Sequence, residues 1–445
     1  MNAPSLVAGQ SRTTPWWLLV LITGGLCLAV AVAVKSAGVF GRHIPTHLLE
    51  EDYLIGLLFG AALALTIIWW PARPEERKVL LYLWAARMVT TMLLMLVYEN
   101  QYDFLDSYSY FAESRGIAQG IYVEDAAFGT RNVTYMFAGL WYVIPPSFHA
   151  LKIFCAYLGL IAVFIFYRAW RLAMPGNSLT PLWILGLTPS VLFWSSVLGK
   201  DPVVLLGIAI ATWGVMRQWR YGGAAAWGVV ILGIAVMSAI RPWMGPIILG
   251  AIGLASLLRP SSPAARWVWL GLGVLAIAIG YVLYGNYADE IAKFSMLEAL
   301  ETVSSSWAIG GSASTENLAF SSPADVIRFL PLGAFTALFR PLPGEIGGAF
   351  GLAAGGENLL LLGLMLWATW RVLLTRWNFP LMFLICAITL WTLLYAFLSY
   401  QNLGTAVRFK LQVMPLLMAL IGYAWAGQRA PDQTSSVAPS GVTAS

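Results

Sequence analysis

Residues 380–398 read PLMFLICAITLWTLLYAFL and contain no charged side chain. A helix needs about 20 mostly apolar residues to cross the hydrocarbon core of a bilayer, so this stretch has the composition and length of a membrane span. The rest of the chain follows the same pattern, because 59% of its 445 residues are hydrophobic and only 11% are charged. An ordinary soluble domain carries about 25% charged residues. The composition therefore predicts an all-α polytopic membrane protein.

Twelve stretches are apolar enough to predict membrane helices. They are 15–35, 53–70, 79–98, 148–168, 180–197, 201–216, 224–240, 243–259, 266–284, 357–374, 380–398 and 408–426. With the N-terminus inside, short inner loops carry many Arg and Lys residues, as the positive-inside rule expects of the cytoplasmic side. We therefore predict a single transmembrane domain over 15–427, with a cytoplasmic N-terminus over 1–14. The tail 428–445 is rich in Ser, Thr, Pro and Ala and is predicted to be disordered in the cytoplasm.

Two predicted outer loops, about 99–147 and 285–356, are too long to be simple connectors. Long loops in compact proteins are usually functional or disordered. Both contain apolar and aromatic residues at helical spacing, so we expect surface helices within them. Of the 21 acidic residues, only Glu75, Glu76 and Asp432 fall on the predicted cytoplasmic side. Polar groups in such a chain concentrate where function is, so the site is expected on the extracytoplasmic face.

The first outer loop opens with an acidic and aromatic stretch. Residues 102–111 read YDFLDSYSYF and contain Asp103 and Asp106. Residues three apart lie on one face of a helix. A carboxylate at this place could act as a general base on an acceptor hydroxyl, or coordinate a metal ion. The alternative is that both residues are solvated and that Asp106 is the N-cap of a surface helix.

Four basic residues fall on the outer side, against the positive-inside trend: Lys200, Arg241, Arg340 and Arg408. Together they could form a pocket for a phosphate or pyrophosphate, to which Arg would supply bidentate contacts. Taken singly, each has a simpler explanation. A lysine at a membrane interface snorkels, and an arginine near a helix C-terminus complements the helix dipole.

Two further features concern residues near these cations. Asp201 and Pro202 resemble an N-cap followed by the first helical residue, which favours a structural role for Asp201. Lys200 would then lie beside a helix N-terminus, which favours anions. Arg87 lies within a predicted span and needs a partner or a water-filled cavity.

Several other kinds of chemistry have no sequence signal. The chain contains no G-x-x-x-x-G-K-[ST], H-E-x-x-H or G-x-S-x-G motif, so no nucleotide cofactor is expected. Cys27, Cys155 and Cys386 all lie in apolar runs, which argues against a disulfide framework or a zinc site. The cations are spread over many loops, so no nucleic-acid partner is expected. A divalent cation with Asp106 among its ligands is the one cofactor that the pattern leaves open.

Residues 106–112, DSYSYFA, together with the many predicted spans and the outer cations, resemble the GT-C class of membrane glycosyltransferases, which includes protein O-mannosyltransferases and aminoarabinose transferases. The resemblance covers roughly residues 79–420 by organisation. It implies a polyprenyl-phosphate-linked sugar donor and a glycan, lipid or protein acceptor, as in envelope or exopolysaccharide assembly. It also implies that Asp106, or else Asp103, serves the acceptor or a metal, and that Lys200, Arg241, Arg340 and Arg408 hold the lipid phosphate.

The chain departs from that class in two respects. The acidic loop normally follows the first membrane helix, but here it follows the third predicted span, and a large globular outer domain is missing. Three alternatives therefore stay open. The first is a polymerase or ligase of the O-antigen type that uses pyrophosphate-linked repeats, the second is a transporter or lipid flippase, and the third is a scaffold for polysaccharide assembly. The predicted location is a bacterial inner membrane, with both termini cytoplasmic and membrane lipids around the spans.

Overall fold

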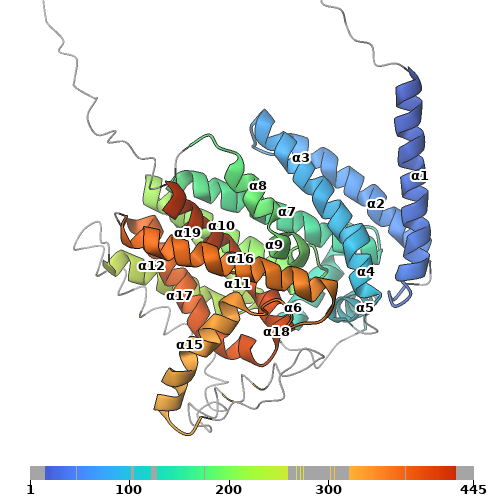
Figure 1. Cartoon of the computed structure of the whole chain (residues 1–445). Helices are drawn as coiled ribbons and strands as arrows, with labels where there is room; N and C mark the ends of the chain where they lie inside the picture. The colour runs from blue at the N-terminus through green and yellow to red at the C-terminus, as the bar shows by residue number, and fades with distance from the viewer. Residues whose placement is uncertain are drawn as a thin grey trace, which may run out of the picture.

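The computed structural model describes residues 16–46, 48–101, 105–121, 128–174, 176–258, 320–375 and 377–426, together with the single positions 267, 271, 274, 301 and 305. All regular secondary structure in these residues is helical, without strands, as the composition predicts (Figure 1). Within them, six helices are long and apolar enough to cross a membrane, or seven if one bent pair forms a single span. The protein is therefore a helical membrane protein, but the twelve predicted spans are not confirmed.

The six long spans include several composite helices. They are Leu49–Trp69 (α2 and η1), Pro74–Glu99 (α3, η2 and α4), Phe148–Ala173 (α7), Lys200–Tyr221 (α10), Gly348–Leu373 (α16) and Phe379–Tyr400 (α17). In the second of them, η2 (Thr90–Leu94) is a π-helical segment. Such segments occur frequently at functional sites, and this one lies one turn before the end of the span at Glu99.

The other described helices are shorter, bent, or at the edge of the bundle. They are α1 (Trp16–Phe40), α5 (Asp106–Ala118), α6 (Phe128–Leu140), α8 (Thr180–Leu187), α9 (Pro189–Trp194), α11 (Ala224–Ile240), α12 (Met244–Leu258), α15 (Pro323–Phe339), α18 (Leu403–Lys410) and α19 (Met414–Ala426). Helix α1 stands beside α2 at one side of the bundle, whereas α5, α6 and α18 lie toward its lower side in Figure 1.

Two of the expected spans are divided or bent in the structure, and a third cannot be compared. The predicted span 180–197 is divided at Thr188 into α8 and α9, because Pro189 disfavours a helical conformation at the residue before it. The predicted span 408–426 begins earlier, as α18, and bends by 60° before α19. The predicted span 266–284 lies outside the described residues except for three single positions, 267, 271 and 274.

The two predicted outer loops contain helices. Helices α5 and α6 fall in the first loop and pack against each other. In the second loop, α15 packs against α17 and α18, and α16 begins at Gly348 rather than at residue 357. These helices pack against one another and against the spans, so Asp106, in the first turn of α5, is held against the bundle.

Helix α7 is the centre of the bundle, since it packs against α2 and α10, and α10 in turn packs against α11. The α10–α11 contact depends on glycines. A Cβ atom at Gly233 would lie 2.3 Å from the backbone nitrogen of Ala211, so only glycine permits this approach. Close packing of small residues is a common way for membrane helices to associate. This contact matters for the site because α10 begins, and α11 ends, beside it.

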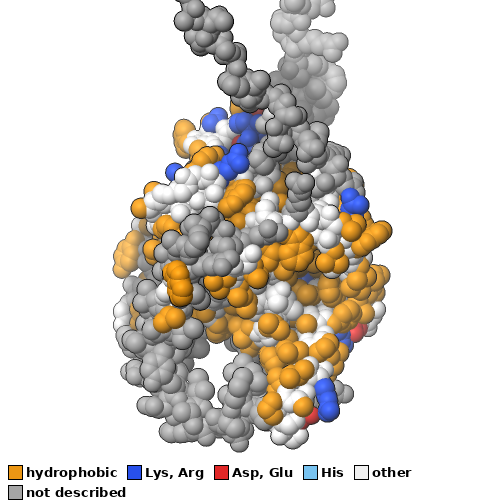
Figure 2. All heavy atoms as spheres, turned by 90° about the vertical axis from the view of Figure 1, so that its left-hand side faces the viewer, with side chains coloured by type: hydrophobic (Ala, Val, Ile, Leu, Met, Phe, Trp, Pro, Cys, Tyr) orange, Lys and Arg blue, Asp and Glu red, His pale blue; other side chains and the backbone are white. Residues whose placement is uncertain are grey.

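The surface of the bundle is largely apolar. Figure 2 shows hydrophobic side chains over much of the middle of one face, with a group of Lys and Arg side chains at its upper end. On α16, Leu366 and Trp370 are among the exposed apolar side chains. A water-soluble monomer rarely exposes so much contiguous apolar surface, and lipid tails are its natural solvent. The face is therefore consistent with contact with a bilayer.

Candidate functional site

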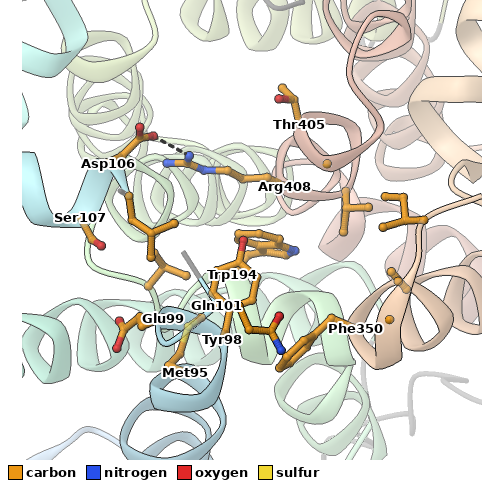
Figure 3. A pocket seen from close by; sticks show the side chains of 18 of the residues that line it. Met95, Tyr98, Glu99, Gln101, Asp106, Ser107, Trp194, Phe350, Thr405 and Arg408 are labelled. Atoms are coloured by element: carbon orange, nitrogen blue, oxygen red, sulfur yellow. Dashed lines mark hydrogen bonds and ion pairs between the residues drawn. The ribbon is translucent and has the colours of Figure 1, made fainter. Parts of the chain in front are cut away.

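A cavity of about 600 Å³ lies where α4, α5, α9, α16 and α18 meet. Its charged lining residues are Glu99, Asp106 and Arg408 (Figure 3). Asp106 and Arg408 point toward each other, and the Nη1 atom of Arg408 donates a hydrogen bond of 2.8 Å to Oδ2 of Asp106. The cavity thus contains both a carboxylate and a cation that the sequence singles out.

Aromatic side chains form another part of the cavity lining. Tyr98 from α4, Trp194 from α9 and Phe350 from α16 lie together in Figure 3. The Tyr98 ring makes edge contacts with the Phe350 and Trp194 rings at centroid distances of 5.5 and 6.3 Å. Such contacts hold large apolar side chains in fixed orientations. The cavity is therefore polar toward α5 and α18 and aromatic between α4, α9 and α16.

Behind the cavity, Arg408 is held by a second carboxylate. Its Nε atom donates to Oδ2 of Asp201, and Oδ1 of Asp201 accepts a bond of 3.0 Å from Nη2 of Arg241. The guanidinium of Arg241 also lies 4.2 Å from the ring centroid of Phe409. Only 1% of the Asp201 side chain is exposed, against 55% of the Asp106 side chain. Arg408 therefore joins a buried ion pair to a solvent-facing one.

Local helix geometry places these charges. Asp106 and Asp201 occupy the first turns of α5 and α10, where a negative charge is favoured by the helix dipole, and Arg408 lies in the last turn of α18. Neither aspartate is an N-cap, so both N-cap predictions were wrong. The caps are Leu105 and Gly199, and both carboxylates accept bonds from arginines instead.

Lys200 adjoins this cluster without lining the cavity. Its Nζ atom donates a bond of 2.6 Å to Oγ1 of Thr130 on α6 and lies 5.7 Å from the ring centroid of Tyr110. Burial and the charge of Asp106 raise the pKa of the Tyr110 hydroxyl above its ordinary value. Tyr110 is therefore neutral at pH 7, and the ammonium group of Lys200 supplies a positive charge beside its ring.

Arg340 belongs to a different cluster. Its Nε atom donates a bond of 2.8 Å to Oε1 of Glu345, and its Nη2 atom lies 2.7 Å from the same oxygen. Partial burial works to raise the pKa of Glu345, but the bonds from Arg340 and from the backbone N–H of Leu342 outweigh it and hold that pKa below its ordinary value. Arg340 does not line the cavity. The predicted four-cation pocket is thus divided, with Lys200, Arg241 and Arg408 together and Arg340 apart.

The remaining predictions concern Asp103 and a metal ion. Asp103 lies outside the described residues. Among the residues that are described, no three His, Cys, Asp or Glu side chains gather in a way that could hold a metal ion. Asp106 is instead engaged by Arg408. The described site therefore offers Asp106 as a carboxylate next to a cation rather than as one member of a ligand set.

A buried ion pair beside the cavity was missed at the sequence level. Lys152 on α7 bonds Glu99 at 2.8 Å, and their side chains are 0% and 4% exposed. Lys152 falls inside the predicted span 148–168, and an ionisable residue within a span is itself a signal of a functional or paired site. Glu99 was taken only as the start of the outer loop, although it is a second acidic residue of the cavity lining.

Arg87 has hydroxyl partners. Its Nη1 atom donates to Oγ of Ser195 at 2.6 Å and to Oγ of Ser196 at 3.3 Å. A Cβ atom on Gly159 would lie 2.7 Å from the same Nη1 atom, so glycine makes room for the guanidinium. Ser195 and Ser196 follow Trp194 directly, and Trp194 lines the cavity. Arg87 thereby supports the turn beneath the site.

Comparison with known proteins finds no family model, no curated protein and no solved structure that matches the chain. The resemblance to GT-C glycosyltransferases therefore depends on the acidic motif and the outer cations. Of those residues, Asp106 and Arg408 line one cavity, and Arg241 is linked to them through Asp201. The chemistry of this cluster is the basis for a functional assignment.

Proposed function

We propose that the protein is a membrane glycosyltransferase that moves a sugar from a polyprenyl-phosphate-linked donor to an acceptor hydroxyl on the extracytoplasmic face. The observation that supports this most directly is the Asp106–Arg408 pair in a cavity of about 600 Å³. Such a transfer needs a group that takes a proton and a group that holds a departing phosphate. The two residues supply these in one place.

Asp106 and Arg408 together account for the proton and the leaving group of the transfer reaction. The acceptor oxygen attacks the anomeric carbon, and the bond from that carbon to the phosphate oxygen breaks. Asp106 takes the proton of the acceptor hydroxyl as general base. The electron pair of the broken bond leaves with the polyprenyl phosphate, whose growing negative charge Arg408 stabilises. The donor is already activated by its phosphate, so no nucleotide is consumed.

The other cavity residues fit a lipid-linked substrate. Tyr98, Trp194 and Phe350 supply aromatic surface against which a sugar ring or the first part of a lipid chain can pack. Met95, which is on α4 like Tyr98, lines the same space. The acceptor would be a glycan, lipid or protein, and the setting would be envelope or exopolysaccharide assembly in a bacterial inner membrane.

The experiment that tests this proposal is a transfer assay in proteoliposomes with a radiolabelled polyprenyl-phosphate sugar. The parent should form a new glycosidic bond, and Asp106→Asn should lower its rate by about a hundredfold or more, which is the usual contribution of a general base. Asp325→Asn is the matched control, because Asp325 is also in the first turn of a helix and also pairs with an arginine, but it lies away from the cavity. Equal rates for the parent and Asp106→Asn would contradict the proposed role.

A transporter is the second candidate, because one observation favours it. Helices α18 and α19 meet at a 60° bend directly after Arg408 and Lys410, and broken helices beside charged groups are typical of transporter binding sites. The same proteoliposomes discriminate the two functions. Movement of a lipid-linked sugar across the bilayer without any new glycosidic bond would favour the transporter. A pyrophosphate-using polymerase would instead form bonds only from pyrophosphate-linked repeats.

A further inference from the structure

The two carboxylates on Arg408 differ in how firmly they are held. Asp201 bonds both Arg408 and Arg241 and is almost completely buried. Asp106 bonds Arg408 alone, and more than half of its side chain is exposed. Exposed ion pairs contribute little because water and salt compete for both partners. The Asp106 side of Arg408 is therefore the side from which another anion could displace a carboxylate.

The other outer cations are less accessible from the cavity. Arg241 is 6% exposed and bound to Asp201, Lys200 bonds Thr130, and Arg340 bonds Glu345. None of the three lines the cavity, whereas Arg408 does. An anion that enters the cavity therefore meets Arg408 first, and it meets it on the Nη1 edge that Asp106 occupies.

We propose that a single phosphoryl group replaces Asp106 on Arg408, so that donor binding itself releases the Asp106 carboxylate. This inference rests on the proposed function. Asp201 stays on the Nε side and keeps the guanidinium in place during the exchange. The released carboxylate is repelled by the bound phosphate and turns to the acceptor hydroxyl. The donor consequently binds before the acceptor, and Asp106 is held by an ion pair until the phosphate is present.

The exchange predicts a gain of affinity when Asp106 loses its charge. Asp106→Asn removes the competing anion and keeps the shape of the side chain. Binding of farnesyl phosphate, a short polyprenyl monophosphate, should tighten by up to about fivefold, as expected when an exposed ion pair no longer has to be broken. Arg408→Gln should weaken it by about tenfold or more, because a charge-assisted bond to the phosphate is lost.

The measurement is calorimetric titration of purified protein in detergent with farnesyl phosphate, with uncharged farnesol as the reference for tail binding. Asp325→Asn changes the net charge by the same amount on an exposed helix end and should bind like the parent. Arg408→Lys, which keeps the charge, provides a second variant if Arg408→Gln fails to fold. It should bind more weakly than the parent and more tightly than Arg408→Gln.

Two results would overturn the exchange. One is that Asp106→Asn binds farnesyl phosphate as the parent does or more weakly. The other is that the parent and all variants bind farnesyl phosphate no more tightly than farnesol. Either result leaves the transfer assay unaffected, so the glycosyltransferase proposal could survive it. Conversely, Asp106→Asn could bind farnesyl phosphate more tightly while the parent transfers no sugar. That result would support the exchange and contradict the proposed glycosyltransferase activity.

Discussion

At the scale of residues, the site depends on one arginine between two unlike carboxylates. Arg408 bonds Asp201 in the interior and Asp106 at the cavity. The physical difference between the pairs is solvent. Breaking a buried pair leaves an uncompensated charge and costs about 3–5 kcal/mol, whereas an exposed pair contributes about 0–1 kcal/mol. Asp201 is therefore expected to stabilise the fold and Asp106 to serve the chemistry.

This contrast predicts unequal effects of the same substitution. Asp201→Asn should lower the free energy of unfolding by about 3 kcal/mol or more, since Arg241 and Arg408 would both lose a buried partner. Asp106→Asn should lower it by less than about 1 kcal/mol. Unfolding by denaturant in mixed micelles, followed by tryptophan fluorescence, measures both. Similar losses of unfolding free energy in the two variants would contradict the prediction, because the buried pair would then contribute no more to stability than the exposed pair.

The individual residues were predictable to different degrees. Asp106, Arg241 and Arg408 were singled out because they are charges on the predicted outer side of a chain with few charges. Their mutual contacts were not predictable, because Arg408 and Asp201 are 207 residues apart in the chain. Arg340 has the same sequence signal as Arg408, but it pairs with Glu345, five residues away, and does not line the cavity. Sequence composition does not show whether an arginine pairs with a carboxylate nearby in the chain or with one that is distant in it.

At the scale of elements, the positions of the charges follow from where helices begin, end and bend. Asp201 lies in the first turn of α10, Arg241 caps the end of α11, and Arg408 precedes the bend between α18 and α19. Long apolar spans such as α7 and α17 could be predicted from hydropathy. The division at Thr188 was missed although Pro189 is a local signal for it. The 60° bend was missed because the polar end of α18, with Arg408 and Lys410, was joined to the apolar run of α19 as one span.

The glycine contact between α10 and α11 gives a prediction at this scale. Gly233→Val would place new atoms within van der Waals overlap of Ala211, whereas nothing lies within 4 Å of a Cβ atom at Gly228 on the same helix. Gly233→Val should destabilise the protein by about 1–3 kcal/mol and shift Arg241 relative to Asp201. Gly228→Val should have little effect on either. The same unfolding experiment measures stability, and farnesyl phosphate titration measures whether the shift of Arg241 changes the affinity of the site. An unaffected Gly233→Val protein would show that α10 and α11 can separate freely.

At the scale of the whole molecule, the proposal requires the cavity to face outward. The spans, the apolar surface and the group of Lys and Arg side chains at one end are consistent with a membrane protein (Figure 2). The orientation follows from the positive-inside rule alone. Twelve spans were expected, and in the described residues six or seven meet the length and hydropathy of a span. Several apolar runs form short or bent helices, and the predicted span 266–284 lies almost wholly outside the described residues.

Orientation can be measured with single cysteines. Tyr142 and Tyr221 are 85% and 72% exposed, and the proposed topology places them on opposite sides of the membrane. In a background without the three native cysteines, Tyr142→Cys should react with a membrane-impermeant maleimide on intact spheroplasts. Tyr221→Cys should react only after the membrane is permeabilised. The reverse pattern would place the cavity on the cytoplasmic side and contradict the proposed donor and acceptor.

The most direct test of the central claim measures donor binding and sugar transfer in the same Asp106→Asn protein. A polyprenyl-phosphate sugar is titrated into parent and variant proteoliposomes, and bound donor and glycosylated product are both quantified. We predict that Asp106→Asn binds the donor more tightly than the parent and that its rate of product formation is lower by at least about a hundredfold. Weaker donor binding with an unchanged rate of transfer at saturation would contradict the claim, because Asp106 would then hold the donor and take no part in the reaction.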